Sequence, residues 1–168
     1  GLPIILPPPG SPPPSPSSQI PGLGIHQAVV LGGTNAISAG VEPSIQGLGA
    51  ATFRIGGANR AETATKLADF ELAGPASATA DGGLMFLLRH EGSTHAYLAR
   101  SDVFADALAG GPLAASDLAP ILLTASTTLS PETATWLKAN AADINYVTAL
   151  GLGVAVSQSV LDAATVAV

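Results

Sequence analysis

Arginine side chains are the residues of this sequence best suited to binding an anion. The chain has only six basic residues. In the pattern of elements described below, Arg54 lies on a strand, Arg60 at the start of the next helix and Arg100 at the carboxyl end of another strand. A guanidinium group can make two parallel hydrogen bonds to a phosphate or a carboxylate. Ligands of open α/β sheets gather at the carboxyl ends of the strands, so a polyanion site is one interpretation. Pairing with internal acids such as Glu62 or Asp102 is the other.

A second candidate for anion binding is the turn formed by Gly32, Gly33 and Thr34. It follows an apolar strand and precedes an expected helix, where backbone amides can cradle an anion. It lacks the further glycine of a dinucleotide fingerprint and the lysine of a phosphate loop. A tight turn that needs residues without a Cβ atom is the alternative interpretation.

The remaining reactive side chains predict no enzyme. His26, His90 and His95 are scattered, without an acid at metal-ligand spacing, and we expect structural or surface roles and no metal site. Asp102 and Asp106 are four residues apart, which suits either a carboxylate pair or favourable placement near a helix start. The sequence has no Cys and no Gly-x-Ser-x-Gly elbow. No catalytic residue and no cofactor are therefore predicted.

Strands and helices that alternate along the chain must position these residues. Short apolar runs predict strands near residues 28–31, 51–55, 96–99, 121–123 and 144–150. Helix-start signals precede the segments between them: Ser38, Asn59 with Glu62, Ser130 with Pro131 and Glu132, and Ser157. Such alternation predicts an α/β fold, an open parallel sheet with helices on both faces in a Rossmann-like or Toprim-like three-layer arrangement.

The segment Ser101–Thr124 forms the centre of this pattern. Asp102 is predicted to cap a helix in which Phe104 and Leu108 share one apolar face. Pro112 is expected to kink or interrupt that helix. The run from Ile121 to Leu123 is short and wholly apolar, which is typical of a strand covered on both faces. Elsewhere, Trp136 and Tyr146 are predicted to be packing residues, because aromatics make up only 4 % of the chain.

Four segments in this order resemble the cell wall-binding repeat 2 family. Ser101–Thr124 resembles the central segment of the repeat, and Pro120-Ile-Leu-Leu123 its apolar motif. The segment Arg54-Ile-Gly-Gly-Ala-Asn-Arg60-Ala-Glu-Thr-Ala resembles the repeat opening. Gly32-Gly33-Thr34, followed by Ala36-Ile37-Ser38, resembles the repeat ending. The resemblance covers most of the chain from Val29 onward.

This resemblance implies a non-catalytic module that anchors a secreted protein to the cell wall or surface layer of a bacterium. The implied partner is an anionic secondary wall polymer, a phosphate- or carboxylate-bearing glycan. The residues expected to bind it or shape its site are Arg54, Arg60, Arg100, Pro120, Ile121, Leu122 and Leu123. Members of the family resemble one another in carrying three tandem repeats around a pseudo-threefold axis, so trimeric packing is expected, within one longer chain or between three chains.

The domain organisation follows from composition and from an internal repeat. Residues 1–24 are rich in Pro and Ser and predict a disordered, semi-rigid linker. Residues 25–168 form the module, with 25–50 as the tail of one repeat and 51–168 as a nearly complete repeat. An insertion is expected near 74–94, and its sequence pattern predicts a hairpin. Leu31 to Val41 aligns without gaps with Leu150 to Val160, although the second copy lacks Gly-Gly-Thr.

Charge and hydropathy narrow the partners further. The formal net charge of −6 disfavours nucleic acid and anionic membranes as partners. No apolar run has the length needed to cross a bilayer. The alternatives to an anchoring module are an enzyme, either a wall hydrolase or a small nucleotide-using α/β protein, and a purely structural surface-layer spacer.

Overall fold

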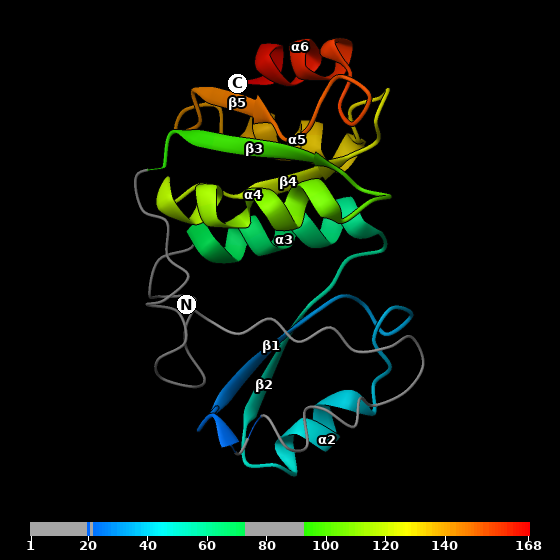
Figure 1. Ribbon diagram of the computed structural model, residues 1–168, viewed down its shortest axis with the longest axis vertical. Helices are drawn as coiled ribbons and strands as arrows, with labels where there is room; N and C mark the ends of the chain where they lie inside the picture. Colours follow the sequence, from blue (N-terminus) through cyan, green and yellow to red (C-terminus); the bar gives the residue numbers. More distant parts are fainter. Residues whose placement is uncertain (1–19, 21, 73–92) are drawn as a thin grey trace. The chain divides into compact units, whose positions relative to one another are not determined.

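The computed structural model describes residue 20 and residues 22–72 and 93–168. The chain divides into two compact units, one ending at Ala58 and one beginning at Asn59 (Figure 1). Most of the expected linker and nearly all of the expected insertion near 74–94 lie outside the described residues. The boundary between these units, after Ala58, differs from the expected boundary between sequence repeats, after residue 50. The repeat boundaries therefore stay predictions.

The first unit is a β–α–β arrangement. Strand β1 (Gln27–Leu31) and strand β2 (Ala51–Ile55) pair in parallel over five residues, joined by helix α2 (Val41–Gln46). Its small core contains Ile20, Val30, Val41, Ile45 and Ala50. Helix α2 begins after Gly40, which makes no side-chain cap bond, so the expected Ser38 cap is wrong. Pro43 falls in the first turn, where a missing backbone N–H does little harm.

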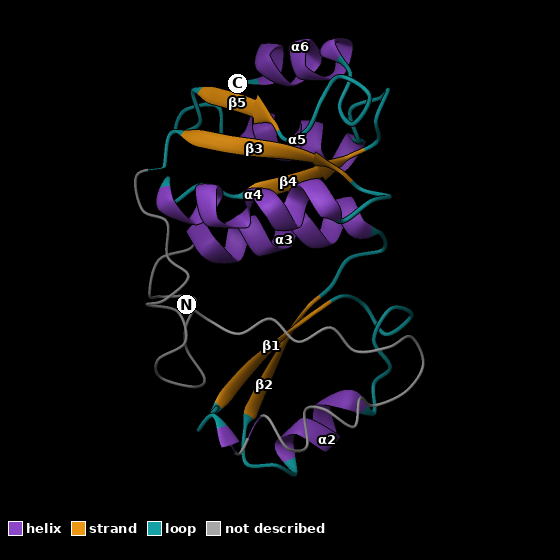
Figure 2. Ribbon diagram, viewed as in Figure 1, coloured by secondary structure: helices purple, strands orange, loops and turns teal. Residues whose placement is uncertain are grey.

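The second unit is a three-layer α/β structure. In the described part of this unit, three parallel strands lie in the order β4 (Ile121–Thr124), β3 (His95–Arg100) and β5 (Tyr146–Ala149). The described residues also form four helices that surround them: α3 (Arg60–Leu72), α4 (Ala105–Ser116), α5 (Pro131–Ala139) and α6 (Gln158–Ala167) (Figure 2). The predicted α/β class, parallel sheet and helices on both faces are confirmed.

Strand β3 is the buried centre of the second unit. Its residues 96 to 99 are all buried, and their side chains alternate between two layers. On one face, Leu98 packs with residues of α3, α5 and α6 in the larger core cluster. On the other face, Tyr97 packs with Ala114 of α4. Strand β4, expected to be covered on both faces, is an edge strand among the described residues, and only Leu122 and Thr124 are buried in it.

Two of the predicted helix starts carry side-chain caps. The Asn59 carboxamide oxygen accepts the Glu62 amide at 2.9 Å, and the Ser157 hydroxyl accepts the Val160 amide at 3.4 Å. Pro131 begins α5 as predicted, although the Ser130 hydroxyl makes no cap bond. Asp102 does not cap α4, which begins at Ala105 after Phe104.

Helix α4 presents apolar residues to solvent, contrary to expectation. Phe104 and Leu108 were predicted to be a packed face, but they are 74 % and 52 % exposed. The helix instead meets the sheet through small residues, Gly110 and Ala114. A Cβ atom at Gly110 would overlap the side chain of Leu150, so glycine permits this close approach. The helix continues through Pro112 rather than being interrupted.

The two aromatic residues predicted to pack differ in outcome. Trp136 is buried in the larger core cluster, and its indole N–H donates to Asp69 at 2.7 Å, which confirms the prediction. Tyr146 is 66 % exposed on the edge strand β5, so its prediction is wrong. Periodicity could not distinguish the two, because each occurs in a short segment with apolar neighbours.

Glu71 makes the stability of the second unit depend on pH. Burial raises the pKa of its carboxyl from the ordinary 4.5 to about 7. Between these values the unfolded chain releases a proton that the folded chain keeps, so folding stability falls as pH rises. The free energy of unfolding falls by about 3 kcal/mol at most over this pH range. We expect Glu71→Gln to remove this loss and to raise stability at pH 7.5 relative to wild type.

The free energy of unfolding is measured for both proteins by chemical denaturation at pH 4.5 and pH 7.5. The change between the two pH values is then compared for wild type and Glu71→Gln. Asp162→Asn, which removes one exposed carboxylate from α6, controls for the loss of a charge. Identical pH dependence in wild type and Glu71→Gln would contradict the prediction.

Candidate functional site

Thr124 organises the carboxyl edge of the sheet in the second unit. Its backbone oxygen accepts the amide of Ser101, the residue after β3, at 2.8 Å. Its hydroxyl accepts the amide of Ser130, the residue before α5, at 2.9 Å and donates to the Thr128 oxygen at 3.1 Å. Thr124 is fully buried, so these bonds are shielded from water. It thereby fixes Ser101 and Ser130 relative to each other.

A cavity of about 160 Å³ lies at this edge. It is lined by Asn59, Arg60, Ala61, Ser101, Ser130 and Glu132. Two helices, α3 and α5, begin at its wall, and their first-turn amides carry partial positive charge. The cavity therefore combines a guanidinium group, two hydroxyl groups and two helix N-termini, a combination suited to an oxyanion.

One carboxylate in this cavity opposes that charge. Glu132 accepts a hydrogen bond from the Asn59 side-chain amide at 2.7 Å, and this bond lowers the pKa of the Glu132 carboxyl. Glu132 is therefore ionised at neutral pH. Asn59 thus has two tasks: its oxygen caps α3, and its nitrogen ties α3 to α5 through Glu132.

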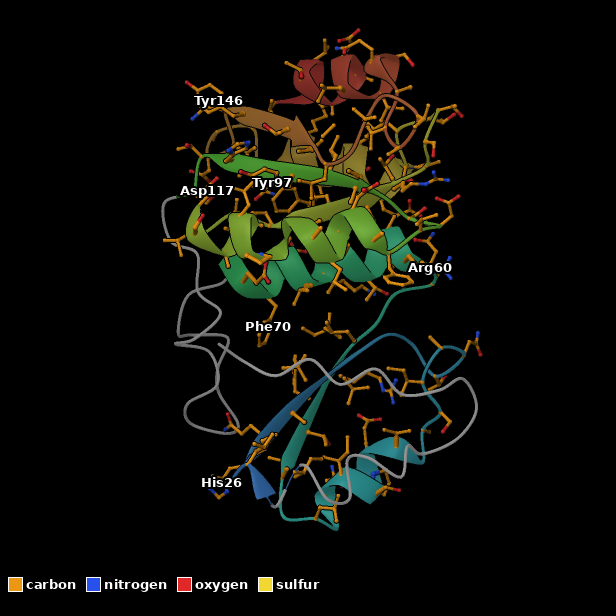
Figure 3. The ribbon with its side chains drawn as sticks, viewed as in Figure 1. His26, Arg60, Phe70, Tyr97, Asp117 and Tyr146 are labelled. Carbon is orange, nitrogen blue, oxygen red and sulfur yellow. The ribbon has the colours of Figure 1, made fainter. Side chains whose placement is uncertain are left out.

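The three predicted arginines differ in how many partners they already have. Arg60 is exposed, and its side chain makes no hydrogen bond or ion pair with the described part of the chain; Figure 3 shows it at the opposite end of the second unit from Tyr146 and Asp117. Arg100 makes two hydrogen bonds to Asp102, at 2.7 and 2.6 Å. This pairing is the main reason that the pKa of Asp102 is lowered, with a smaller contribution from the charge of Arg60.

Arg54 lies in the first unit and is largely enclosed. Its guanidinium donates to the backbone oxygens of Gly32 at 2.6 Å, Ile37 at 3.0 Å and Ser38 at 3.4 Å. It also pairs with Glu42, at 2.9 Å from Nε and 2.8 Å from a terminal nitrogen. These contacts support the pairing interpretation, with Glu42 rather than Glu62 as the acid. Arg54 and Arg60 belong to different compact units.

Other backbone groups of the protein contact the Gly32-Gly33-Thr34 turn, where an anion was one expected ligand. The Gly32 amide donates to the Ile55 oxygen at 2.7 Å, and Gly32 has a φ of +134°, which favours glycine. Gly56 passes so close that a Cβ atom there would lie 2.7 Å from the Gly33 nitrogen. Helix α2 begins seven residues later, at Val41, rather than directly after the turn. These contacts support the tight-turn interpretation.

The Pro120–Leu123 segment contributes to the core more than to the cavity. Pro120 and Leu122 are fully buried, and the Pro120 oxygen accepts the Tyr97 amide at 2.9 Å. Pro120 lies at the amino end of β4, away from the cavity at the carboxyl edge. The Leu123 oxygen accepts the Thr133 hydroxyl at 2.6 Å, which joins β4 to α5. The segment supports the sheet on which the cavity is built.

The histidines form no metal site in the part of the chain that is described. His26 is exposed, whereas His95 stacks on Tyr97 with ring centroids 4.5 Å apart and its Nε2 lies 2.7 Å from the Thr148 hydroxyl. His90 lies outside the described residues. Among the residues described, no three metal-ligating side chains come together.

Sequence reasoning identified Arg60 but missed most of the other cavity residues. Asn59, Ser130 and Glu132 were recognised only as helix-start signals. Those signals were informative, because a helix that starts after a parallel strand places its first turn at the carboxyl edge of the sheet. Ser101 and Thr124 carried no such signal beyond being polar residues at the ends of apolar strands.

Comparison with known protein families gives a match over residues 54–161 to cell wall binding domain 2, CWB2. The chain belongs to the CWB2 family. The match runs from β2 into α6 and includes the whole cavity. The resemblance seen in the sequence is therefore confirmed, and the second unit is a domain of the cell wall binding type.

Relatives of this CWB2 chain include two proteins of Pyrococcus. It is 37 % identical over 109 residues to PH0614 of Pyrococcus horikoshii, covering 65 % of this chain and 28 % of that protein. It is 31 % identical over 140 residues to PYRAB14350 of Pyrococcus abyssi, covering 83 % of this chain and 37 % of that protein. The chain thus spans between about a quarter and somewhat more than a third of the length of these relatives, 28 % of one and 37 % of the other.

Two solved structures share the fold. Cwp8 from Clostridium difficile aligns with a TM-score of 0.61 and 23 % identity, covering 84 % of this chain and 22 % of that one. Cwp6 from Clostridium difficile aligns with a TM-score of 0.61 and 24 % identity, covering 89 % of this chain and 21 % of that one. At this identity the likeness establishes the α/β fold and nothing more specific.

No helix in the described residues combines the length and the apolar character needed to span a membrane.

The contacts of Arg54 predict a structural role. Arg54→Met would leave the carbonyl groups of Gly32, Ile37 and Ser38 without their donor and Glu42 without its partner. We expect the first unit to lose about 2–3 kcal/mol of stability, since hydrogen bonds to a charged group contribute about 1.5–3 kcal/mol each. Amide hydrogen exchange across β1 and α2 measures this loss.

Arg60→Met, which removes an exposed arginine without such partners, is the matched control and should leave exchange in β1 and α2 unchanged. An Arg54→Met protein with wild-type exchange in β1 and α2 would show that these contacts carry no stability.

Proposed function

We propose that this chain is a non-catalytic anchoring module, and that the cavity around Arg60 binds an anionic group of a cell wall polymer. The CWB2 family assignment supports wall binding. The observation that favours this cavity is the Arg60 guanidinium, which is exposed at the N-termini of α3 and α5 and makes no hydrogen bond or ion pair with the described residues. The class of ligand is a phosphate- or carboxylate-bearing glycan, located at the cell surface.

The charges of the protein set the conditions for such binding. With a net charge of −6, long-range attraction opposes a polyanion. Salt screens charges beyond about 8 Å at physiological ionic strength, so groups within the cavity dominate the interaction at contact. Within the cavity Glu132 opposes the anion, whereas Arg60, Ser101 and Ser130 favour it. The affinity of a single module would therefore be modest, and repeated modules would add to it.

Opposite charge changes at Arg60 and Glu132 test the site. We expect Arg60→Gln to weaken binding to purified cell wall sacculi at least about tenfold, from the loss of a charge-assisted hydrogen bond. We expect Glu132→Gln to strengthen binding, because the amide oxygen still accepts from Asn59 while the repulsive charge is removed. Binding is measured by sedimentation of labelled protein with sacculi.

Lys138→Gln is the matched control, because it removes one exposed positive charge at the far end of α5. If Arg60→Gln does not weaken binding and Glu132→Gln does not strengthen it, the binding site lies elsewhere. Sacculi stripped of secondary polymers should lose the interaction. Release of peptidoglycan fragments by the purified chain would instead establish an enzyme.

We further propose that CWB2 modules of this kind associate in threes through the outer face of α4. This face carries Phe104, Leu108 and Leu113, which are 74 %, 52 % and 49 % exposed. The surrounding exposed residues of the helix are small or apolar: Ala105, Ala109, Pro112 and Ala115. Contiguous exposed apolar surface of this kind is typical of a protein–protein interface.

Analytical ultracentrifugation at micromolar concentration tests this association. Wild type should form trimers, and Phe104→Glu should shift the distribution to monomers, because it places a charge in the apolar contact. Val166→Glu, which alters an 86 % exposed residue of α6, is the matched control and should remain trimeric. A wild-type protein that is monomeric throughout would contradict the arrangement.

A further inference from the structure

The loop after β1 and the loop after β5 have the same backbone hydrogen bonds. In the first unit, the amides of Ala36 and Ile37 donate to the Gly33 oxygen at 2.9 and 3.0 Å. In the second unit, the amides of Ala155 and Val156 donate to the Leu152 oxygen at 2.7 and 3.3 Å. These are the positions that the gapless alignment of Leu31–Val41 with Leu150–Val160 makes equivalent.

The first glycine of each loop repeats the same conformation. Gly32 has a φ of +134° and Gly151 a φ of +92°, both in the region that favours glycine. An added Cβ atom would meet the Cβ of Ala36 at 3.3 Å in one loop and that of Ala155 at 2.8 Å in the other. The two strand–loop–helix segments are therefore structural as well as sequence repeats.

The two copies differ in what lies beside the strand. In the first unit, β1 pairs with β2, and the Gly32 amide donates to the Ile55 oxygen at 2.7 Å. In the second unit, β5 pairs only with β3 among the described residues, and no acceptor for the Gly151 amide is found there. The Leu150 amide donates to Leu98 of β3, so the adjacent Gly151 amide faces the outer edge of β5.

The second copy also keeps the carbonyl groups that hold an arginine in the first. Arg54, on β2, donates to the oxygens of Gly32, Ile37 and Ser38. Their counterparts are the oxygens of Gly151, Val156 and Ser157. Within the described part of the chain, the Gly151 and Val156 oxygens accept no hydrogen bond, and Ser157 accepts only from the first turn of α6. The loop thus offers an unfilled set of acceptors for a guanidinium group.

We infer that the outer edge of β5 is a docking site for the opening strand of a further repeat of this family. The occupant is a parallel strand with the pattern of β2: an extended segment whose fourth residue is arginine, followed by Ile-Gly-Gly. Its main chain accepts from the Gly151 amide, as Ile55 accepts from Gly32. Its arginine fills the oxygens of Gly151, Val156 and Ser157.

The proposal explains why β2 lies where it does. Residues 54–64 resemble the opening of a repeat, yet β2 pairs with β1, whose loop resembles the ending of the previous repeat. The opening strand of one repeat therefore completes the sheet of the repeat before it. A single unpaired strand edge is otherwise exposed to non-specific pairing, which proteins avoid by covering it.

One difference sets the expected affinity. Glu42, which pairs with Arg54, lies one residue beyond the aligned segment, and its counterpart there is Leu161 of α6. Helix α6 therefore supplies no carboxylate at this position, and the acid nearest the loop is Asp106 of α4, whose Oδ2 would lie 2.7 Å from a Cβ atom added at Gly151. Without the α6 carboxylate we expect an isolated strand to bind weakly. Leu161 belongs to none of the core clusters, so Leu161→Glu supplies the carboxylate with little change to the core.

A peptide of residues 49–58 added to the isotope-labelled full chain tests the proposal. We expect amide NMR shifts at Val147, Ala149 and Gly151 and in the loop up to Ser157, with weak saturable binding. A peptide with alanine in place of Arg54 should bind roughly tenfold less tightly, since a charge-assisted contact is lost. The Leu161→Glu chain should bind the arginine peptide roughly tenfold more tightly and the alanine peptide no better than wild type does.

N-methylation of the peptide distinguishes strand pairing from simple charge attraction. The Ala51 amide donates to the oxygen of His26, the residue before β1, so by alternation the Phe53 amide faces β1 and the Thr52 amide does not. N-methylation at Phe53 should abolish binding, and N-methylation at Thr52 should not. Absence of shifts along β5, equal binding of the arginine and alanine peptides, or shifts confined to β1 and α2 would each overturn the proposal.

Discussion

The complete burial of strand β3 is the constraint on which the second unit depends. A strand covered on both faces needs apolar or well-paired side chains on each side and a neighbour at each edge. Strands β4 and β5 supply the neighbours, while α4 covers one face and α3, α5 and α6 cover the other. Because all three strands are parallel, their carboxyl ends meet at one edge, and the fully buried Thr124 links that edge to the start of α5. The cavity around Arg60 follows from this arrangement.

The architecture was largely predictable from the sequence, because alternating apolar runs and helix-start residues depend on local chemistry. The layer that each residue faces was not. Ile121–Leu123 is more uniformly apolar than β3, which carries His95, Tyr97 and Arg100, yet β3 is the central strand. The polar atoms of β3 are accommodated by specific partners: the Tyr97 hydroxyl donates to Asp117 on the α4 side, and Arg100 pairs with Asp102. Apolar content alone cannot reveal such partners, which come from distant parts of the sequence.

The arginines show the same limit at the candidate site. Arg54 and Arg60 lie six residues apart in one motif, and the sequence alone did not distinguish a binding role from a structural role for either. Arg54 is surrounded by carbonyl groups of a loop more than fifteen residues earlier and by Glu42, so its charge serves the fold. Arg60, on the first turn of α3, extends from the helix start without such partners in the described residues. The difference arises from tertiary contacts rather than from the residue type or its local spacing.

Helix α4 has a poor intrinsic tendency to be helical, and this affects its motion. Gly110 and Gly111 each cost about 1 kcal/mol and Pro112 about 3 kcal/mol relative to alanine in a helix interior. Contacts on one side, through Gly110 and Ala114, must offset this cost, while the apolar outer side stays in water. Local opening of α4 is therefore expected to need less free energy than opening of the other helices of this unit. Any surface that covers α4 would also order it, so association and the final tightening of this helix would be one cooperative event.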